Sequence, residues 1–137
     1  MGIEQRKRID EILSKRDCAA RRYSKLLSRI DGVTVPAIAD YVTSLGWFVY
    51  VVRLEDSIDR DVFMDYLQDN GVQCRDYFRP VHLQPFYMEE YGYKEGMLPV
   101  TERVSRQTVA IPFFSNISLE EQEYVAETIA RAVERSG

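Results

Sequence analysis

The chain has few of the residues that bind metal ions or form disulfide bonds. It holds a single histidine, His82, and two cysteines, Cys18 and Cys74, which lie far apart in the sequence. Metal sites in proteins need several such ligands at short spacings, so the sequence predicts no metal site. Two distant cysteines also form no disulfide framework, and we expect a reducing compartment, the cytoplasm.

Long hydrophobic runs and concentrated positive charge are scarce as well. No apolar run reaches the roughly 18 residues that a membrane-spanning helix needs. The basic segment at residues 6–8 has no apolar stretch behind it, which argues against a signal peptide. The net charge is −4, and Lys and Arg are spread along the chain, whereas nucleic acids bind to a concentrated basic face. We therefore expect no membrane and no nucleic-acid partner.

What the sequence does contain is a set of segments with the apolar spacing of helices. Residues 3–29 form the longest, far beyond the roughly 11 residues of a typical helix. Such a helix usually links two bodies, and because no good capping residue precedes it, we expect the natural chain to begin earlier. A second helix is predicted over 58–70 with Ser57 as its cap, and a third over 119–134 with a capping box that starts at Ser118.

Strands are predicted where β-branched and aromatic residues cluster. The clearest covers residues 47–54, which are apolar on both faces. We expect this strand to be central and covered on both sides, with the second cover supplied by another domain. Residues 72–75 and 108–112 are shorter candidates. The order strand, helix, strand over residues 47–75 suggests a β-α-β unit.

These elements define one fold class. The chain has 137 residues, the size of one domain, and we take residues 1–137 as a single domain. We predict an α/β protein in the broad sense, an α+β two-layer sandwich. A sheet of three or four strands carries helices on it over about 33–135, led by the long N-terminal helix.

The loop over residues 75–87 is the most unusual segment, because it combines the histidine with two arginines, two prolines and four aromatic residues. Prolines stiffen a loop. Arg75, Tyr77, Arg79 and His82 could together bind an anion such as a phosphate or diphosphate. If the strand continued past Arg75, this residue and Tyr77 would share one face. The alternative is that the aromatic residues belong to the core, His82 is a satisfied histidine and the arginines are solvated.

Motifs of known catalytic chemistry are not found. No glycine-rich phosphate loop follows a strand. Cys74 could in principle act as a nucleophile with His82 as its base. We disfavour this pairing, because Cys74 has the pattern of a buried strand residue.

The loop 75–87, R-D-Y-F-R-P-V-H-L-Q-P-F-Y, resembles the pattern R-x-Y-F-x-P-x-H-x-Q-P-F-Y of the DegT/DnrJ/StrS sugar aminotransferases. The perosamine-synthase-like and spore-coat-polysaccharide branch is the most similar. Residues 5–16, 46–54, 92–102 and 111–114 resemble further family patterns in the same order. The similarity covers the whole chain but only the C-terminal part of the family.

The resemblance implies the small domain of a fold-type I enzyme that uses pyridoxal phosphate (PLP), together with the helix that leads into it. The large PLP-binding domain is absent. The family's reaction moves an amino group from glutamate to a keto-sugar on a nucleotide diphosphate, in polysaccharide and cell-surface sugar biosynthesis. PLP is held there by a lysine of the large domain. Lys7, Lys15, Lys25 and Lys94 do not stand in that context, so we expect no PLP on this chain and no activity of the chain alone.

The resemblance implies that Tyr77 and His82 contact the nucleotide-sugar and that Arg75 and Gln84, which match the pattern, belong to the same substrate-binding loop. Arg79 stands at a variable position of the pattern and is a substrate-binding candidate because of its place in the anion-binding combination. For Gln84, loop packing is an equally good explanation. Asp76 stands where many members carry histidine, so a direct contact there is in doubt.

Two hypotheses follow from this comparison of residues. The first is an enzyme piece that supplies the substrate-side loop, with the missing large domain, a nucleotide-diphosphate sugar and glutamate as partners of the complete enzyme. The second is a free-standing, non-enzymatic regulatory or dimerisation module. Removal from the large domain would leave apolar surface bare, and we therefore expect a homo-oligomer.

Overall fold

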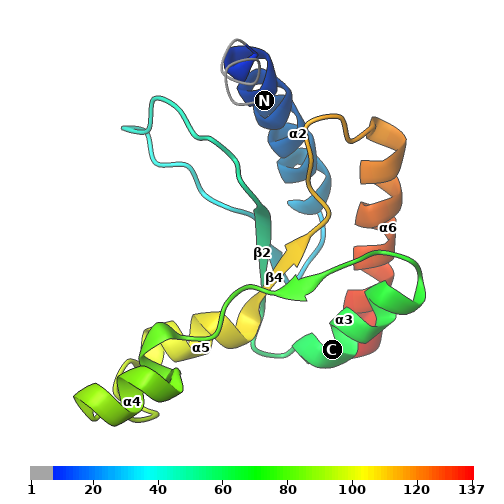
Figure 1. Ribbon diagram of the computed structural model, residues 1–137. Coiled ribbons are helices and arrows are strands. Elements are labelled where there is room, and N and C mark those ends of the chain that lie inside the picture. Colours follow the sequence, from blue (N-terminus) through cyan, green and yellow to red (C-terminus); the bar gives the residue numbers. More distant parts are fainter. Residues whose placement is uncertain (1–7) are drawn as a thin grey trace.

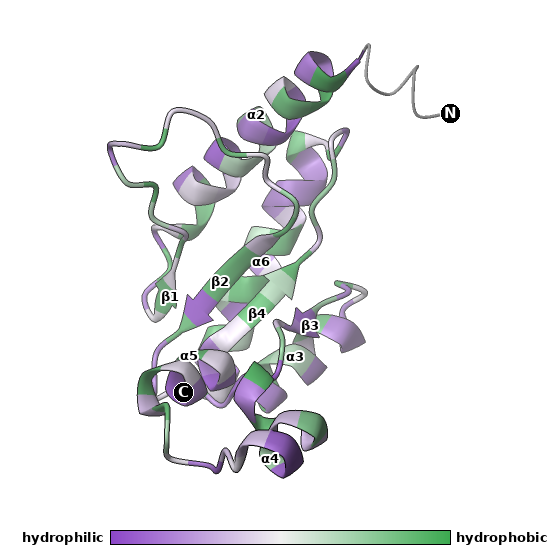
Figure 2. Cartoon of the chain, turned by 60° about the vertical axis from the view of Figure 1, so that its left-hand side comes forward, coloured by the Kyte–Doolittle hydropathy of each residue, from purple (hydrophilic) through white to green (hydrophobic). Residues whose placement is uncertain are grey.

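The computed structural model describes residues 8–137 and has two layers. A four-stranded sheet forms one layer, and three helices cover one of its faces, as Figures 1 and 2 show from two directions. These helices are α2 (Ile9–Leu27), α3 (Arg60–Asp69) and α6 (Leu119–Ser136). The predicted two-layer α/β fold is confirmed. No helix among residues 8–137 is both long and apolar enough to cross a membrane.

The sheet is antiparallel throughout. Its strands are β1 (Val33–Thr34), β2 (Tyr50–Leu54), β3 (Arg75–Asp76) and β4 (Thr108–Ile111), in the spatial order β1-β2-β4-β3. Because β2 and β3 each pair antiparallel with β4, they run parallel to one another with β4 between them. The expected β-α-β unit therefore exists, but it is split by a strand that arrives later in the chain.

The core lies between the sheet and the three helices. Helix α2 contributes only its C-terminal half, with Ala19, Ala20, Tyr23 and Leu27 buried, while Ile9 is 49% exposed. The predicted helix over 3–29 is thus observed from Ile9 to Leu27, and its first turn falls on residues outside the described range. The N-terminal half of α2 extends past the sheet (Figure 1).

Side-chain caps set the starts of α3 and α6. The Asp59 carboxylate accepts from the backbone N–H groups of Asp61 and Val62, at 3.0 and 3.1 Å. The cap is therefore Asp59 and not the predicted Ser57, because Ile58 turns into the core and the helix begins after it. The capping box at the start of α6 is confirmed. Ser118 Oγ accepts from Glu121 N at 3.1 Å, and Glu121 Oε2 accepts from Ser118 N at 2.7 Å.

The predicted strand over 47–54 begins three residues later than expected. Trp47 has a left-handed backbone, with φ of 41°, which interrupts an extended chain. Its indole lies in the core, with a ring centroid 5.7 Å from that of Tyr50, while Phe48 is 84% exposed. Within β2, Val52 and Leu54 are buried, but Arg53 points to solvent. On the face of β2 opposite the helices, Val51 is thus half-buried and Arg53 is exposed.

Two parts of the chain stand away from this body. The first is the loop over residues 35–49, in which Val35 and Trp47 pack with the core whereas Ile38, Tyr41, Leu45 and Phe48 are exposed. The second part, the α4–α5 lobe, comprises residues 81–107 with the short 3₁₀ helix η1 (Val81–Leu83), α4 (Pro85–Tyr91) and α5 (Pro99–Gln107). Figure 1 shows both on the side of the sheet away from α2, α3 and α6.

A pair of phenylalanine substitutions tests this division between core and surface. Phe63 is fully buried on α3, and Phe48 is largely exposed. Phe63→Ala should lower the free energy of unfolding by about 3–5 kcal/mol, because it removes a core ring and leaves a cavity. Phe48→Ala should change it by less than about 0.5 kcal/mol. Chemical denaturation measures both free energies. Equal losses in the two variants would contradict the assignment of Phe63 to the core and Phe48 to the surface.

Candidate functional site

The loop over residues 75–87 leaves the sheet almost at once. Strand β3 ends at Asp76, and Phe78 turns the chain with a left-handed φ of 55°. Tyr77 is half-buried, and its ring centroid lies 4.6 Å from that of Phe78. Because the strand stops before Tyr77, the shared strand face that would place Arg75 beside Tyr77 does not form.

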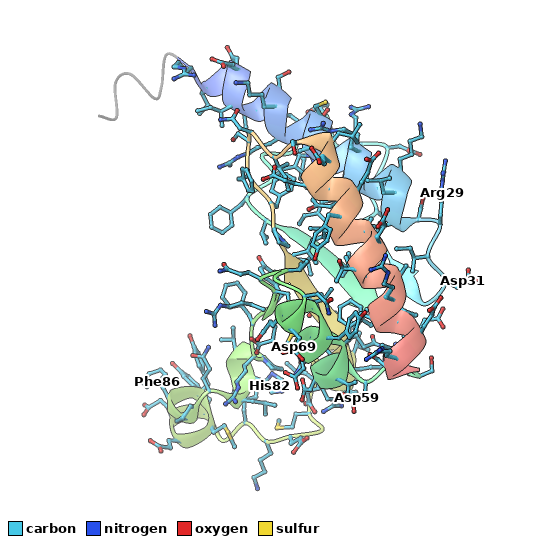
Figure 3. The ribbon with its side chains drawn as sticks, turned by 90° about the vertical axis from the view of Figure 1, so that its right-hand side faces the viewer. Arg29, Asp31, Asp59, Asp69, His82 and Phe86 are labelled. Carbon is cyan, nitrogen blue, oxygen red and sulfur yellow. The ribbon has the colours of Figure 1, made fainter. Side chains whose placement is uncertain are left out.

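His82 lies inside the α4–α5 lobe. It belongs to η1 and is only 6% exposed, and its Nε2 atom is 3.0 Å from Glu102 Oε1. Its ring packs edge-on against Tyr93, with centroids 6.0 Å apart. In Figure 3 His82 is close to the body of the molecule and Phe86 is further out on α4. Inside this chain, His82 is therefore a buried histidine whose Nε2 atom is paired with Glu102.

The Glu102 carboxylate is the centre of the lobe. It is 3% exposed and lies in the first turn of α5, whose N-cap residue, Leu98, offers no side-chain cap. The carboxylate accepts from Gly96 N at 2.9 Å, from Leu98 N at 3.2 Å and from His82 Nε2. One side chain therefore fixes the turn before α5, satisfies a free N–H group at the helix start and holds the histidine.

These two polar residues are also the only buried ones in the lobe. Helix α4 has no buried residue, α5 has Glu102 alone, and η1 has His82 alone. Hydrophobic burial is the usual source of tertiary stability, but here it is weak. The lobe is instead held by a hydrogen-bonded carboxylate and by a series of ring contacts. The rings that make these contacts are His82, Phe86, Tyr87, Tyr91 and Tyr93.

Hydrogen bonding sets the charge of Glu102. The Gly96 N–H group is the main cause that lowers the pKa of the carboxyl; the bonds from His82 and Leu98 act in the same direction, and burial opposes them. The carboxylate is therefore ionised at neutral pH. Sequence analysis assigned no role to Glu102. A glutamate in the first turn of a helix that lacks a capping side chain, in a chain with one histidine, is the signal that could have identified it.

The other predicted site residues lie on the surface. Arg75, Arg79 and Gln84 are exposed, and Tyr77 is half-buried. Arg75 lines a groove of about 810 Å³ along β3 and β4, together with Gln68 and Phe114. None of the other four predicted residues lines this groove. The structure thus spreads the five residues over β3, the turn after it and the base of the lobe.

Cys74 does not form a catalytic pair with His82. Its thiol lies 3.6 Å from the carbonyl oxygen of Met64, and burial raises the pKa of the thiol. His82 Nε2 is engaged by Glu102. A protonated, buried thiol is a poor nucleophile, so the structure supports the preference against this pairing.

The described residues offer no site for a metal ion or for PLP. Among residues 8–137 no group of three His, Cys, Asp or Glu side chains is arranged to hold a metal. Lys15, Lys25 and Lys94 are all exposed, and Lys15 is paired with Glu11 at 2.8 Å. An exposed lysine lacks the enclosed surroundings that PLP needs, so the residues present do not fit this cofactor.

Acid should weaken the lobe. The Glu102 pKa is below its ordinary value of 4.5, so the carboxylate adds stability that is complete above about pH 4.5 and is lost as the pH falls through the lowered pKa. The melting temperature of the wild type should exceed that of Glu102→Gln at neutral pH, and the gap should narrow below pH 4.5. Glu95→Gln, a control on an exposed side chain, should show no gap. A gap that is independent of pH would contradict the prediction.

Comparisons of the sequence with known proteins find aminotransferases and a protein of polysaccharide biosynthesis. The model of the DegT/DnrJ/EryC1/StrS aminotransferase family matches residues 1–130. The chain is 26% identical over 133 residues to the spore coat polysaccharide biosynthesis protein SpsC of Bacillus subtilis, covering 94% of this chain and 34% of SpsC. It is 29% identical over 140 residues to the UDP-4-amino-4-deoxy-L-arabinose–oxoglutarate aminotransferase of Shewanella sediminis, covering 97% of this chain and 36% of that protein.

Solved structures share the fold. The aminotransferase TlmJ of Streptoalloteichus hindustanus superposes with a TM-score of 0.83 at 30% identity, over 98% of this chain and 35% of TlmJ. The PMP form of the putative sugar aminotransferase Spr1654 of Streptococcus pneumoniae has a TM-score of 0.88 at 21% identity, over 98% of this chain and 34% of Spr1654, and shows the fold alone.

The chain thus spans about a third of the length of the relatives that it matches. The resemblance seen in the loop over residues 75–87 is confirmed by a match that extends over nearly the whole sequence. The chain belongs to the DegT/DnrJ/EryC1/StrS aminotransferase family.

Proposed function

We propose that the chain is the C-terminal, substrate-side domain of a PLP-dependent nucleotide-sugar aminotransferase. The observation that carries the proposal is the family match over residues 1–130, which spans about a third of each relative. The missing two-thirds corresponds to the large domain, which supplies PLP as the electron sink for amino transfer. The substrate is a keto-sugar on a nucleotide diphosphate, and the amino donor is glutamate. We assign the complete enzyme to the cytoplasm.

The loop over residues 75–87 contributes substrate contacts in this proposal. Arg75 and Arg79 are exposed guanidinium groups, which suit the two phosphates of a nucleotide diphosphate. Tyr77 offers a half-buried ring and a hydroxyl, and Gln84 an exposed amide at the start of α4. His82 contacts the substrate through the small part of its ring that is exposed. The spread of these groups over β3, the turn after it and the base of the lobe fits an extended ligand.

Exposed apolar residues on one side of the sheet support the proposal that a large domain is missing. On β2, Arg53 is exposed and Val51 is half-buried, and the loop over 35–49 and the α4–α5 lobe stand on the side of the sheet away from α2, α3 and α6 (Figure 1). Tyr41 and Phe48 on the loop are 87% and 84% exposed, and Phe86 on the lobe is 62% exposed. Exposed apolar groups of this kind mark contact surfaces. We propose that the large domain covers them in the complete enzyme.

Without that domain the same surface should drive self-association into a homo-oligomer. Sedimentation velocity of the isolated chain should show species above the monomer that grow with concentration. A Tyr41→Ser/Phe48→Ser variant should shift the population toward monomer, whereas Leu119→Ser, on the helical layer and also exposed, should not. A strict monomer at high concentration would contradict the exposed surface as a contact site.

A chimera tests the function itself. The C-terminal third of the Shewanella sediminis enzyme is replaced with this chain, and amino transfer to 2-oxoglutarate from the UDP-4-amino sugar in that enzyme's name is assayed. The chimera should bind PLP and transfer amino groups, whereas this chain alone should keep no PLP absorbance band after dialysis. Arg79→Ala in the chimera should raise the KM for the UDP-sugar about tenfold, the cost of a charge-assisted hydrogen bond of ~1.5 kcal/mol.

The control is Arg131→Ala, which removes an exposed arginine of α6 that lies on the helical layer. It should leave KM unchanged. A folded chimera that retains PLP but transfers no amino group would contradict the proposal. That result would favour the alternative, a non-enzymatic regulatory or dimerisation module.

A further inference from the structure

The contact between His82 and Glu102 restricts where the histidine carries its hydrogen. Both side chains are buried, and Nε2 and Oε1 are 3.0 Å apart. An ionised carboxylate only accepts hydrogen bonds, so Nε2 must be the donor. In the neutral ring, the other nitrogen, Nδ1, then carries no hydrogen and can only accept.

Nδ1 is not enclosed by the protein. Among the described residues, the fully enclosed side-chain polar atoms without a partner are Arg16 Nε, Arg22 Nε and Gln122 Oε1. His82 Nδ1 makes no hydrogen bond to a described residue, and yet it is not one of these atoms. It is therefore not fully enclosed, although the ring as a whole is buried. In the neutral ring, an acceptor of this kind suits a hydroxyl or N–H donor, whereas an ionised phosphate oxygen has no hydrogen to donate to it.

We propose that Glu102 is a positioning residue for the substrate-side loop, which holds the hydrogen of neutral His82 on Nε2 and so presents Nδ1 as an acceptor to a hydroxyl or N–H group of the nucleotide-sugar. This inference rests on the proposed function. It separates two roles within the loop, since the arginines face the phosphates and the histidine faces the sugar or base. It also differs from the sequence-based hypothesis, in which His82 was one of the anion-binding groups.

The contacts of Glu102 require a carboxylate at this position. The same two oxygens accept from Gly96 and Leu98 and from His82. The turn before α5 therefore fixes the carboxylate, and the carboxylate fixes the ring. In this way the 94–98 turn controls which atom of His82 faces the substrate. An amide or an aliphatic side chain at this position cannot accept all of these bonds at once.

The single histidine makes the test direct, because a ¹⁵N-labelled chain gives only one pair of ring-nitrogen signals. At a pH where a titration of these signals shows the ring to be neutral, Nε2 should have the shift of a protonated nitrogen and Nδ1 that of an unprotonated one. Glu102→Leu should move both signals toward the average of the two tautomers. Glu95→Leu, in the same turn but exposed, should leave them unchanged.

The wild-type spectrum alone decides the hydrogen position, so the test survives if Glu102→Leu loosens the lobe. A hydrogen on Nδ1 in the wild type, or unchanged signals in a folded Glu102→Leu variant, would overturn the role of Glu102 and leave the proposed function standing.

Ligand titration tests the second part with the same signals. UDP-glucose should shift the Nδ1 signal, whereas inorganic pyrophosphate should shift only backbone signals near Arg75 and Arg79. A Nδ1 response to pyrophosphate equal to that with UDP-glucose would overturn the acceptor role. No response of any loop signal to UDP-glucose would count against both the acceptor role and the proposed function, although the tautomer result would stand.

Discussion

The Glu102 carboxylate holds together a part of the chain that has almost no core of its own. Residues 81–107 bury only His82 and Glu102, and these two bond to each other. Because removing one partner of a buried polar pair leaves the other unsatisfied, the lobe is more sensitive to this one side chain than to any of its exposed aromatic residues. The order of the loop over 75–87 near His82 depends on it.

The rest of the chain is stabilised in the ordinary way. Tyr50, Val52 and Leu54 on β2 pack with Phe63 and Ile129 of the covering helices, and the burial of such side chains provides the main driving force for folding. That core lies on one side of the sheet. The other side carries the apolar loop over 35–49 and the lobe. The exposed apolar groups on that side are the surface that we propose the large domain covers, and the chain spans about a third of the length of the relatives that it matches.

Sequence patterns predicted what local chemistry determines. The capping box at Ser118 was identified because both of its residues are present in the sequence, and the two-layer class followed from the helix and strand segments. Contacts between distant segments could not be predicted from the sequence. Nothing local shows that β4 inserts between β2 and β3, or that Trp47 leaves the strand to place its indole in the core. The cap at Asp59 was missed because Ser57 is an equally good capping residue and only the burial of Ile58 decides between them.

The candidate site shows the same limit. The loop over 75–87 was recognisable from its residues, but the partner of His82 lies twenty residues later along the chain and no periodicity links the two. Hydrogen exchange tests most directly whether the single carboxylate of Glu102 orders this lobe. The amide hydrogens of Gly96 and Leu98, which donate to Glu102, should be protected in the wild type, and both should exchange at least about tenfold faster in Glu102→Gln. Unchanged protection of these two amides in the variant would contradict the account.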